Sequence, residues 1–358
     1  MTDPVRVAVI GLGRIGAPHA RHVRQIADET GECRLVALVD SDRPRAERLA
    51  AELGAPEERV RAFASIEELV AAGICSASIV ATPTGKHREH AETLIEAGYR
   101  VLLEKPMTDS IASDREFVGK LNREAPHALM LAFQRRFDAP LRHAKELLDD
   151  GAIGRAFKIV SILEDSGPLP DGYQSPGLLE DMSVHNVDEV RWLAGQEPVA
   201  AAAIGARLYS HRLTSAAEDF DDALLYLWFE GEFRAQVQVS RNHVSGYRVE
   251  TWIFGEQGHI HAGHFEQRRR EVLVEAYGRE RVIDRRRFPL PDYGSEAPEF
   301  VARFGPAYKA EVAHFVRCCR RGEPFGVDQN DGLKAMAVID AASRAFIERQ
   351  AGGGVARF

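Results

Sequence analysis

The sequence predicts a protein of two domains, an α/β domain built on a doubly wound parallel sheet and an α+β domain built on a large, mostly antiparallel open sheet that helices cover on one face. Three observations predict this class. The chain has 358 residues, more than one hydrophobic core usually serves. Its first third alternates short apolar strands with helices, as parallel sheets do. Beyond about residue 155, longer strands with alternating polarity and short links favour antiparallel pairing.

Charge and hydropathy exclude several classes of protein. The formal net charge is -8, and no long basic run is present, which argues against a nucleic-acid partner. No apolar run approaches the ~20 residues of a membrane span, and the N-terminus lacks the basic and apolar regions of a secretory signal. The cysteines show no metal-ligand spacing. We therefore expect a cytoplasmic protein with no metal and no membrane partner.

The first strand and helix of the chain carry its strongest local motif. An apolar strand over residues 7–10 leads into Gly11-Leu12-Gly13-Arg14-Ile15-Gly16, and a helix follows from residue 17 to about 28. The next strand, over residues 35–39, ends in Asp40. A G-x-G-x-x-G turn between strand and helix, with an acidic residue at the end of the following strand, is the fingerprint of a dinucleotide-binding Rossmann domain.

Each part of this fingerprint has a physical role. Gly11 permits the tight turn, Gly13 lets backbone N–H groups approach a pyrophosphate, and Gly16 lets the helix pack closely. Asp40 is placed to accept hydrogen bonds from ribose hydroxyls and to repel a 2′-phosphate, which favours NAD. NADP stays open because Arg43 and Arg45 follow closely. A glycine turn without a nucleotide is the weaker alternative.

Alternation continues to the end of the first domain, with helices near 43–53, 66–72, 86–97 and 113–124 and strands near 60–63, 77–81 and 100–103. Polar residues end two of these strands, Thr82-Pro83 and Glu104-Lys105-Pro106. We expect both to face the cofactor, because ligands gather at the carboxyl ends of parallel strands. Lys105 is then placed to polarise a substrate oxygen, although a lone lysine is usually just solvated.

We place the cofactor domain at residues 1–127 and a substrate-binding and oligomerisation domain at residues 128–358. The second domain begins with a strand over residues 129–133 and a helix near 140–150, and two helices near 299–320 and 332–350 close the chain. Packing of the last helix on the first domain is left open. The run 225–229 is apolar on both faces of its strand, so we expect a homodimer or homotetramer through the open face of the second sheet.

The stretch over residues 180–193 holds a second candidate site. At helical period Asp181, His185 and Asp188 share one face of a helix. By spacing alone, a solvated acidic edge is the stronger interpretation. The sharper interpretation is an acid–base histidine oriented by a carboxylate. The dinucleotide fingerprint and Lys105 favour this sharper interpretation, because they give the helix a cofactor to face.

Together these motifs resemble the family of glucose-fructose oxidoreductase and inositol dehydrogenase, often called Gfo/Idh/MocA. The resemblance covers almost the whole chain, because the glycine turn, Thr82-Pro83, Glu104-Lys105-Pro106 and the Asp181–His185 helix follow one another in the family's order. It implies that Lys105, Asp181 and His185 carry the reaction. The residues expected to bind the cofactor are Gly11, Gly13, Arg14, Ile15, Gly16, Asp40, Thr82, Pro83, Glu104 and Lys105.

Within this family the chain is most similar to the myo-inositol 2-dehydrogenase branch, through the runs 133–138, 185–188, 240–242 and 246–247. The similarity implies that Gln134, Arg135, Asp188 and Tyr247 contact the substrate. Two departures leave the exact polyol open. Asn186 stands where an acidic residue is commoner, and Glu164-Asp165-Ser166 replaces a run that usually contains His or Arg.

We therefore expect an NAD-dependent dehydrogenase that oxidises a secondary hydroxyl of a cyclic polyol, such as myo-inositol to 2-keto-inositol. As the hydride passes to nicotinamide C4, His185 accepts the hydroxyl proton, Asp181 orients the imidazole, and Lys105 neutralises charge on the oxygen. Whether Lys105 or His185 takes the proton first stays open. A dehydrogenase or reductase of a pyranose sugar or sugar acid is the nearest alternative, and a non-catalytic dinucleotide sensor is the distant one.

Overall fold

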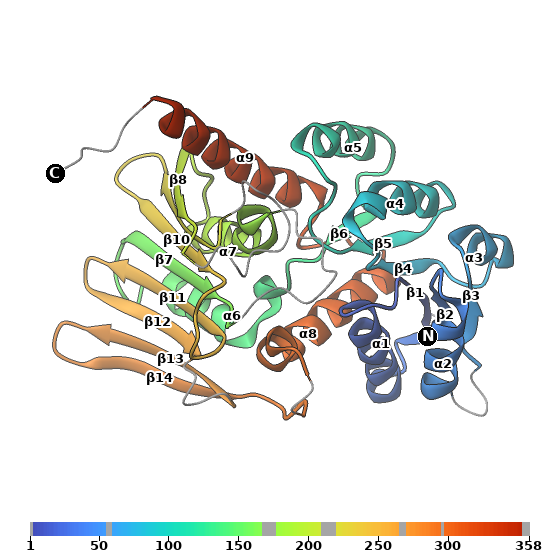
Figure 1. Cartoon of the computed structure of the whole chain (residues 1–358). Helices are drawn as coiled ribbons and strands as arrows, with labels where there is room; N and C mark the ends of the chain where they lie inside the picture. Colours follow the sequence, from blue (N-terminus) through green and yellow to red (C-terminus); the bar gives the residue numbers. More distant parts are fainter. Residues whose placement is uncertain are drawn as a thin grey trace. The chain divides into compact units, whose positions relative to one another are not determined.

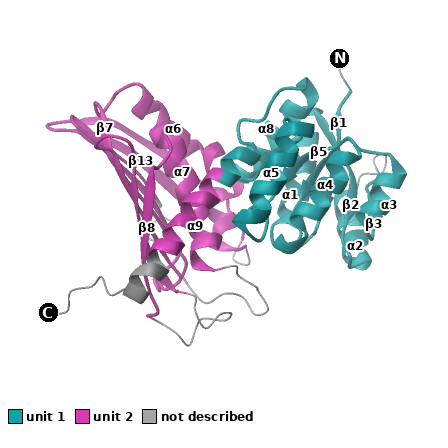
Figure 2. Cartoon of the chain, turned by 90° about the horizontal axis from the view of Figure 1, so that it is seen from above, with its two compact units in different colours: residues 1–134, 307–333 teal, residues 135–306, 334–358 magenta. Residues whose placement is uncertain are grey.

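The structure is a computed structural model that describes residues 3–54, 59–166, 177–208, 220–264, 270–294 and 297–352. The chain divides into two compact units, which Figure 2 colours separately. Unit 1 comprises residues 1–134 and 307–333, and unit 2 comprises residues 135–306 and 334–358. The chain thus leaves unit 1 after residue 134, returns to it at residue 307 and passes back into unit 2 at residue 334. The domain boundary expected after residue 127 stays a prediction.

Within the described residues, unit 1 holds a six-stranded parallel sheet in the order β3-β2-β1-β4-β5-β6, which confirms the doubly wound prediction. Its strands are β1 Val5–Ile10, β2 Cys33–Val39, β3 Arg61–Phe63, β4 Ala77–Val80, β5 Arg100–Leu103 and β6 Leu129–Leu131. Its helices are α1 Gly16–Thr30, α2 Arg43–Leu53, α3 Ile66–Ala72, α4 His87–Glu96 and α5 Ile111–Glu124, with a 3-10 turn, η1, at Thr84–Lys86.

Strand order in this sheet reverses between β1 and β4. Parallel crossovers are right-handed, so helix α1, which follows β1, and helix α4, which follows β4, lie on opposite faces of the sheet (Figure 1). The central strands are therefore covered on both sides, and Val7, Ala8 and Val9 of β1 are fully buried. The glycine turn after β1 and the end of β4 both lie at this switch point, where doubly wound sheets bind their ligands.

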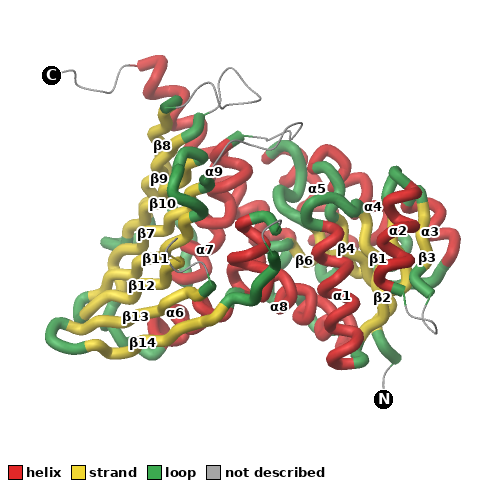
Figure 3. Tube along the Cα trace, turned by 60° about the horizontal axis from the view of Figure 1, so that its bottom comes forward, coloured by secondary structure: helices red, strands yellow, loops and turns green. Residues whose placement is uncertain are grey.

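Unit 2 is built on an eight-stranded sheet, as counted over the described residues, in the order β14-β13-β12-β11-β7-β10-β9-β8 (Figure 3). The strands are β7 Ala156–Glu164, β8 Ala200–Ala206, β9 Asp222–Trp228, β10 Arg234–Ser240, β11 Arg248–Gly255, β12 Gly258–His264, β13 Glu271–Gly278 and β14 Val282–Pro289. Adjacent described strands are antiparallel except for the β7–β10 pair, which is parallel. The prediction of a large, mostly antiparallel open sheet is confirmed.

Helices α6 Ala139–Asp149 and α7 Val184–Ala194 pack against this sheet, α6 on β12 and β13 and α7 on β7 and β10. Two long helices, α8 Glu299–Arg321 and α9 Gln329–Gly352, each contribute residues to both units. Short 3-10 turn η2 spans Gln134–Phe137. Within the described residues, no helix combines the length and the apolar character needed to cross a bilayer.

Side chains alternate across strand β9. Leu225 and Leu227 are fully buried, whereas Leu224 on the opposite face is 42% exposed. Tyr226 and Trp228 share that opposite face and pack edge to face, with ring centroids 4.7 Å apart. Strand β9, which contains most of the run predicted to be apolar on both faces, therefore buries Leu225 and Leu227 on one face and presents Tyr226 and Trp228 on the other.

The stretch expected to form one α-helix over residues 180–193 begins differently. Leu179–Ser183 forms a π-helical turn, η3, and regular α-helix follows as α7 until Gly195 ends it with φ 64°. Asp181 lies in the π turn and His185 in the first turn of the α-helix. π turns inside helices are frequent at functional sites. The residue spacing is compatible with both helix types, so the sequence pattern does not distinguish them.

Candidate functional site

The glycine turn of unit 1 has the geometry that a dinucleotide needs. Gly11 has φ 81°, and a Cβ atom there would lie 2.7 Å from the carbonyl oxygen of Ala81. A Cβ atom at Gly16 would lie 1.7 Å from the carbonyl oxygen of Gly11. A Cβ atom at Gly13 would instead meet open space. The first and third glycines are thus required by packing, while the space beside the second fits a pyrophosphate close to the backbone.

Asp40 is fixed at the end of β2 as the fingerprint predicts. One carboxylate oxygen accepts a hydrogen bond from the backbone N–H of Leu12 at 2.8 Å, and the other accepts from the backbone N–H of Asp42 at 2.9 Å. Arg45 also lies 3.4 Å from this carboxylate. The carboxylate is therefore tied to the glycine turn itself, where the dinucleotide fingerprint places its acidic residue. The residues present fit NAD.

The residues that end β4 and β5 are joined by a histidine that the sequence analysis did not identify. His87 is buried, and its two ring nitrogens lie 2.7 Å from the carbonyl oxygen of Thr82 and 2.8 Å from that of Pro106. Burial lowers the pKa of His87, against the opposing effect of the two carbonyl groups. The ring thus bridges the two strand ends that the sequence predicts to face the cofactor, and the peptide between Lys105 and Pro106 is cis.

In unit 2 the candidate acid–base helix is held by an arginine from a neighbouring strand end. Arg241, which follows β10 and is buried, donates through Nη2 to Oδ2 of Asp181 at 3.2 Å. His185 lies one turn further along and is half-buried. The guanidinium thus gives Asp181 a charge-assisted hydrogen bond that fixes its position.

Asp188, a predicted substrate contact, is engaged by two arginines. Arg136 binds both of its carboxylate oxygens, at 2.8 and 2.6 Å, and Arg191 donates to one of them at 3.1 Å. Asp188 is 1% exposed. The sequence pattern did not identify Arg136 in this role, although the residue lies within the run 133–138 that carries the family resemblance.

Arg135, a second predicted substrate contact, lies in a buried polar network. Its Nη1 donates to Oε2 of Glu189 at 2.7 Å, and Glu189 is fully buried. The other oxygen of Glu189 accepts hydrogen bonds from the hydroxyls of Ser161 at 2.9 Å and Thr251 at 2.6 Å. Asn186 Nδ2 donates to the Ser161 hydroxyl at 2.7 Å. The network therefore ties α7 to strands β7 and β11 and fixes the Arg135 guanidinium.

The remaining predicted substrate residues are also buried. Gln134 is 3% exposed and begins η2. Tyr247 lies just before β11, and its burial raises the pKa of its phenol well above the ordinary value. Glu164, where the sequence departs from the family pattern, accepts hydrogen bonds from Gln238 at 2.7 Å and Arg248 at 3.1 Å. This acidic departure is thus compensated inside the sheet.

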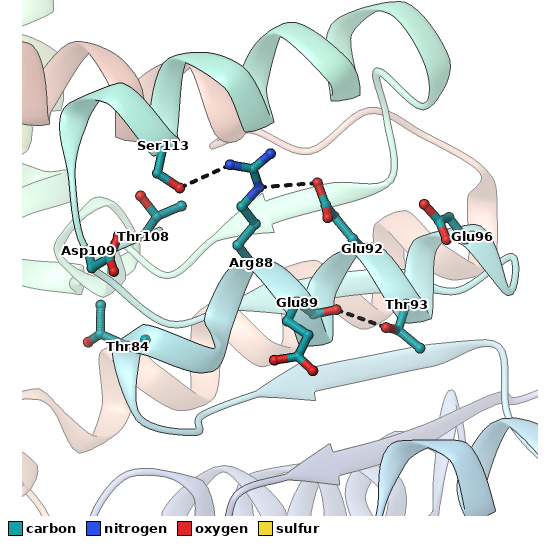
Figure 4. A pocket seen from close by; sticks show the side chains of 10 residues that line it. Thr84, Arg88, Glu89, Glu92, Thr93, Glu96, Thr108, Asp109 and Ser113 are labelled. Carbon is teal, nitrogen blue, oxygen red and sulfur yellow. Dashed lines mark hydrogen bonds and ion pairs between the residues drawn. The ribbon is translucent and has the colours of Figure 1, made fainter.

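A hollow of about 360 Å³ also lies in unit 1, along the length of α4 and beside the start of α5 (Figure 4). Arg88 of α4 crosses it and donates to Ser113 at 3.2 Å and to Glu92 at 3.3 Å. The predicted site residues are not among those that line it. In the described part of the chain, no group of three or more His, Cys, Asp and Glu side chains is arranged to hold a metal ion.

Unit 1 thus offers a dinucleotide site, and unit 2 offers a carboxylate and an imidazole on one helix. This combination defines a dinucleotide-dependent oxidoreductase. Comparison with known families agrees. Residues 5–133 match the GFO/IDH/MocA oxidoreductase family, NAD-binding Rossmann fold, and residues 141–261 match the GFO/IDH/MocA C-terminal domain. The chain belongs to the Gfo/Idh/MocA oxidoreductase family, and the sequence-based resemblance is confirmed.

Relatives resemble the chain over its full length. An inositol 2-dehydrogenase of Rhizobium meliloti is 31% identical, with 97% of this chain and 98% of the relative covered. An NAD(+)-dependent scyllo-inositol 2-dehydrogenase of Bacillus subtilis is 29% identical, with 97% and 95% covered. The crystal structure of scyllo-inositol dehydrogenase from Lactobacillus casei with bound NAD(H) and scyllo-inositol is 25% identical, with a TM-score of 0.78 and 97% and 98% of the two chains covered.

Proposed function

We propose that this protein is an NAD-dependent inositol 2-dehydrogenase that oxidises one secondary hydroxyl of the ring to a ketone. The observation that carries the proposal is the presence of a complete acid–base set, Lys105, Asp181 and His185, in a chain that resembles inositol 2-dehydrogenases from end to end. A non-catalytic dinucleotide sensor would have no need of these three side chains.

Each residue of the set has a distinct task in this proposal. His185 accepts the proton of the reacting hydroxyl, since imidazole titrates nearest neutral pH. Asp181, itself held by Arg241, fixes the ring and stabilises its charged form. Lys105 neutralises negative charge on the substrate oxygen. Bound NAD supplies the hydride acceptor at its nicotinamide ring.

We assign the other ring hydroxyls to Gln134, Arg135, Asp188 and Tyr247. Support comes from the fixed state of two of these side chains: Arg135 is held by Glu189, and Asp188 is held by Arg136. Side chains locked in this way lose little conformational entropy when a polyol binds, so they discriminate between hydroxyl stereochemistries more sharply than mobile ones.

His185→Ala tests the proposal, with NADH formation from myo-inositol and scyllo-inositol as the readout. A general base contributes ~10²–10⁴-fold, so kcat should fall by about that factor. NAD affinity should be unchanged, because the dinucleotide fingerprint lies in unit 1. His127→Ala is the matched control, since His127 is exposed on unit 1 and belongs to no proposed site. Wild-type turnover in His185→Ala would refute the assignment.

We further propose that the open face of the unit 2 sheet is covered by a second copy of the chain. Tyr226 and Trp228 of β9 lie on this face, and on the same face, beyond β10 and β7, Trp252 of β11 stacks on His261 of β12 with ring centroids 3.9 Å apart. Aromatic surfaces of this kind are typical of interfaces. Light scattering after gel filtration should give a multiple of the 39.7 kDa chain mass, and a monomer at micromolar concentration would contradict the proposal.

We also propose a reducing compartment, the cytoplasm, as the site of action. All four cysteines are free thiols. Disulfides are rare where glutathione and thioredoxin keep thiols reduced. Fractionation of cells that produce the protein, with NADH-forming activity as the readout, would test this, and recovery of the activity outside the cytoplasm would contradict it.

A further inference from the structure

Unit 1 contains a cluster of buried ionisable side chains directly behind the strand end that carries Lys105. His19 and His22 come from α1, Glu104 ends β5, and Glu311 comes from the part of α8 that belongs to unit 1. His19 and Glu311 are 0% exposed, and His22 and Glu104 are 4% and 8% exposed. Buried ionisable groups are costly unless they are paired, so this arrangement calls for a physical reason.

Two members of the cluster form a chain of contacts that ends at the Lys105 backbone. His19 Nε2 lies 2.7 Å from Oε1 of Glu104. The other oxygen of Glu104 accepts a hydrogen bond from the backbone N–H of Lys105 at 3.3 Å. On the C-terminal side of Lys105, the ring of His87 contacts the carbonyl oxygen of Pro106 at 2.8 Å. The Lys105 segment is therefore held on each side by a buried imidazole.

The other two members of the cluster do not share this task. Burial raises the pKa of Glu311 well above the ordinary value, and the charge of Glu104 raises it further. Neither oxygen of Glu311 has a hydrogen-bond partner among the described residues. Burial, with His19 and Lys309, lowers the pKa of His22 to about 3. At neutral pH His22 is thus neutral, burial favours the protonated form of Glu311, and the His19–Glu104 pair carries the polar interaction.

We propose that His19 is a positioning residue, which holds Glu104 so that its second oxygen anchors the Lys105 backbone and so aims the Lys105 ammonium at the substrate oxygen. The inference rests on the proposed catalytic role of Lys105. It requires a hydrogen-bond donor at position 19, not merely a buried side chain of the right size. A displacement of about 1 Å in a catalytic group costs up to ~10²-fold in rate, so the effect is large enough to measure.

The test compares His19→Leu, which removes the donor, with His19→Gln, whose amide N–H can replace it. His22→Gln is the matched control, because His22 lies three residues further along α1 and is also buried. In His19→Leu, kcat with myo-inositol should fall by about 10²-fold while KM for NAD changes by less than about 3-fold. His19→Gln should recover at least about 10-fold of that loss, and His22→Gln should resemble the wild type. A purely structural role would affect His19→Leu and His19→Gln alike.

His19→Leu leaves the Glu104 carboxylate buried without its imidazole, which can prevent folding. If His19→Leu does not fold, the double variant His19→Leu/Glu104→Gln is measured in its place, because it leaves no buried charge uncompensated. It should show the same loss of kcat. A folded His19→Leu variant with kcat within about 3-fold of the wild type would overturn the inference. Failure of the proposed function is recognised separately: the wild type would form no NADH from inositols, or Lys105→Met would be as active as the wild type.

Discussion

The buried ion pair between Arg135 and Glu189 gives the sharpest prediction about stability. Both side chains are at most 2% exposed, and their closest atoms are 2.7 Å apart. Glu189→Ala leaves the Arg135 guanidinium buried without its charge partner and also removes the acceptor for Ser161 and Thr251. Removal of one partner from a buried pair costs about 3–5 kcal/mol, so the free energy of unfolding of unit 2 should fall by that amount.

Urea unfolding followed by intrinsic fluorescence measures this change in unit 2 alone, because all three tryptophans, Trp192, Trp228 and Trp252, lie there. Protein concentration must be held constant, since association adds to apparent stability. Glu256→Ala is the control, because Glu256 pairs with Arg155 on the surface, and exposed pairs of this kind contribute little.

The double variant Arg135→Met/Glu189→Leu should recover part of the loss, because it leaves no unpaired buried charge. A loss below about 1 kcal/mol in Glu189→Ala would contradict this expectation, since it would mean that water or a relaxed side chain compensates the unpaired guanidinium of Arg135.

Three further predictions concern cofactor choice, pH dependence and the acid–base pair. Asp40→Ser should lower kcat/KM for NAD about 10-fold, because a hydrogen bond to a charged group is worth ~1.5–3 kcal/mol. It should raise kcat/KM for NADP, because the carboxylate that repels a 2′-phosphate is gone. An unchanged ratio of kcat/KM for NAD to kcat/KM for NADP in initial-rate assays would contradict this prediction. Burial raises the pKa of Asp114 to about 6 in the folded state, so the folded protein holds this proton more tightly than the unfolded chain and loses stability as pH rises from about 4 to 6. Asp114→Asn removes this cost, so it should raise the Tm at pH 8 and leave the Tm unchanged below pH 4. Arg241→Leu should lower kcat at least about 10-fold without affecting NAD affinity, measured by calorimetry, because Asp181 loses its anchor.

Local sequence patterns predict much of the fold. The apolar run of β1, the glycine turn and Asp40 lie within about 35 residues of one another, and each has a local physical reason, so the dinucleotide site of unit 1 follows directly from the sequence. The identity of Lys105, Asp181 and His185 as candidates also follows from local spacing and motif order. Their roles stay predictions.

Contacts between distant residues are not predictable in this way. His19 and Glu104 are 85 residues apart, and Arg135 and Glu189 are 54 apart, and no local periodicity signals either pair. Arg241 lies 60 residues beyond Asp181. Such pairs form because the fold places two polar groups in one buried space, where each needs a partner. The position of the polar residues can be read from the sequence, but the choice of partner depends on the tertiary structure.

The charged, turn-rich segment over residues 265–297 shows a second reason why parts of the fold escape sequence-based prediction. Its pattern predicts little structure, yet it contains β13 and β14. Arg285 pairs with Glu275 across these strands at 2.7 Å, and Arg287 pairs with Glu271 at 3.3 Å. Ion pairs of this kind between neighbouring strands stabilise a hairpin at the sheet edge. In β13 the buried residues Val272, Val274 and Ala276 alternate with outward-facing ones, whereas the charged run 284–287 of β14 masks any such alternation. Residues 265–269 of the same segment lie outside those that the structure describes.

The most direct test of the account follows the hydride itself. The enzyme is incubated with NAD and with myo-inositol that carries deuterium at C2, and the reduced cofactor is analysed by mass spectrometry. We expect that NADH forms with deuterium on the nicotinamide ring, that the labelled substrate reacts more slowly than the unlabelled one, and that His185→Ala abolishes most of the product. Reduced cofactor without deuterium, or no reduced cofactor from either myo-inositol or scyllo-inositol, would contradict the account.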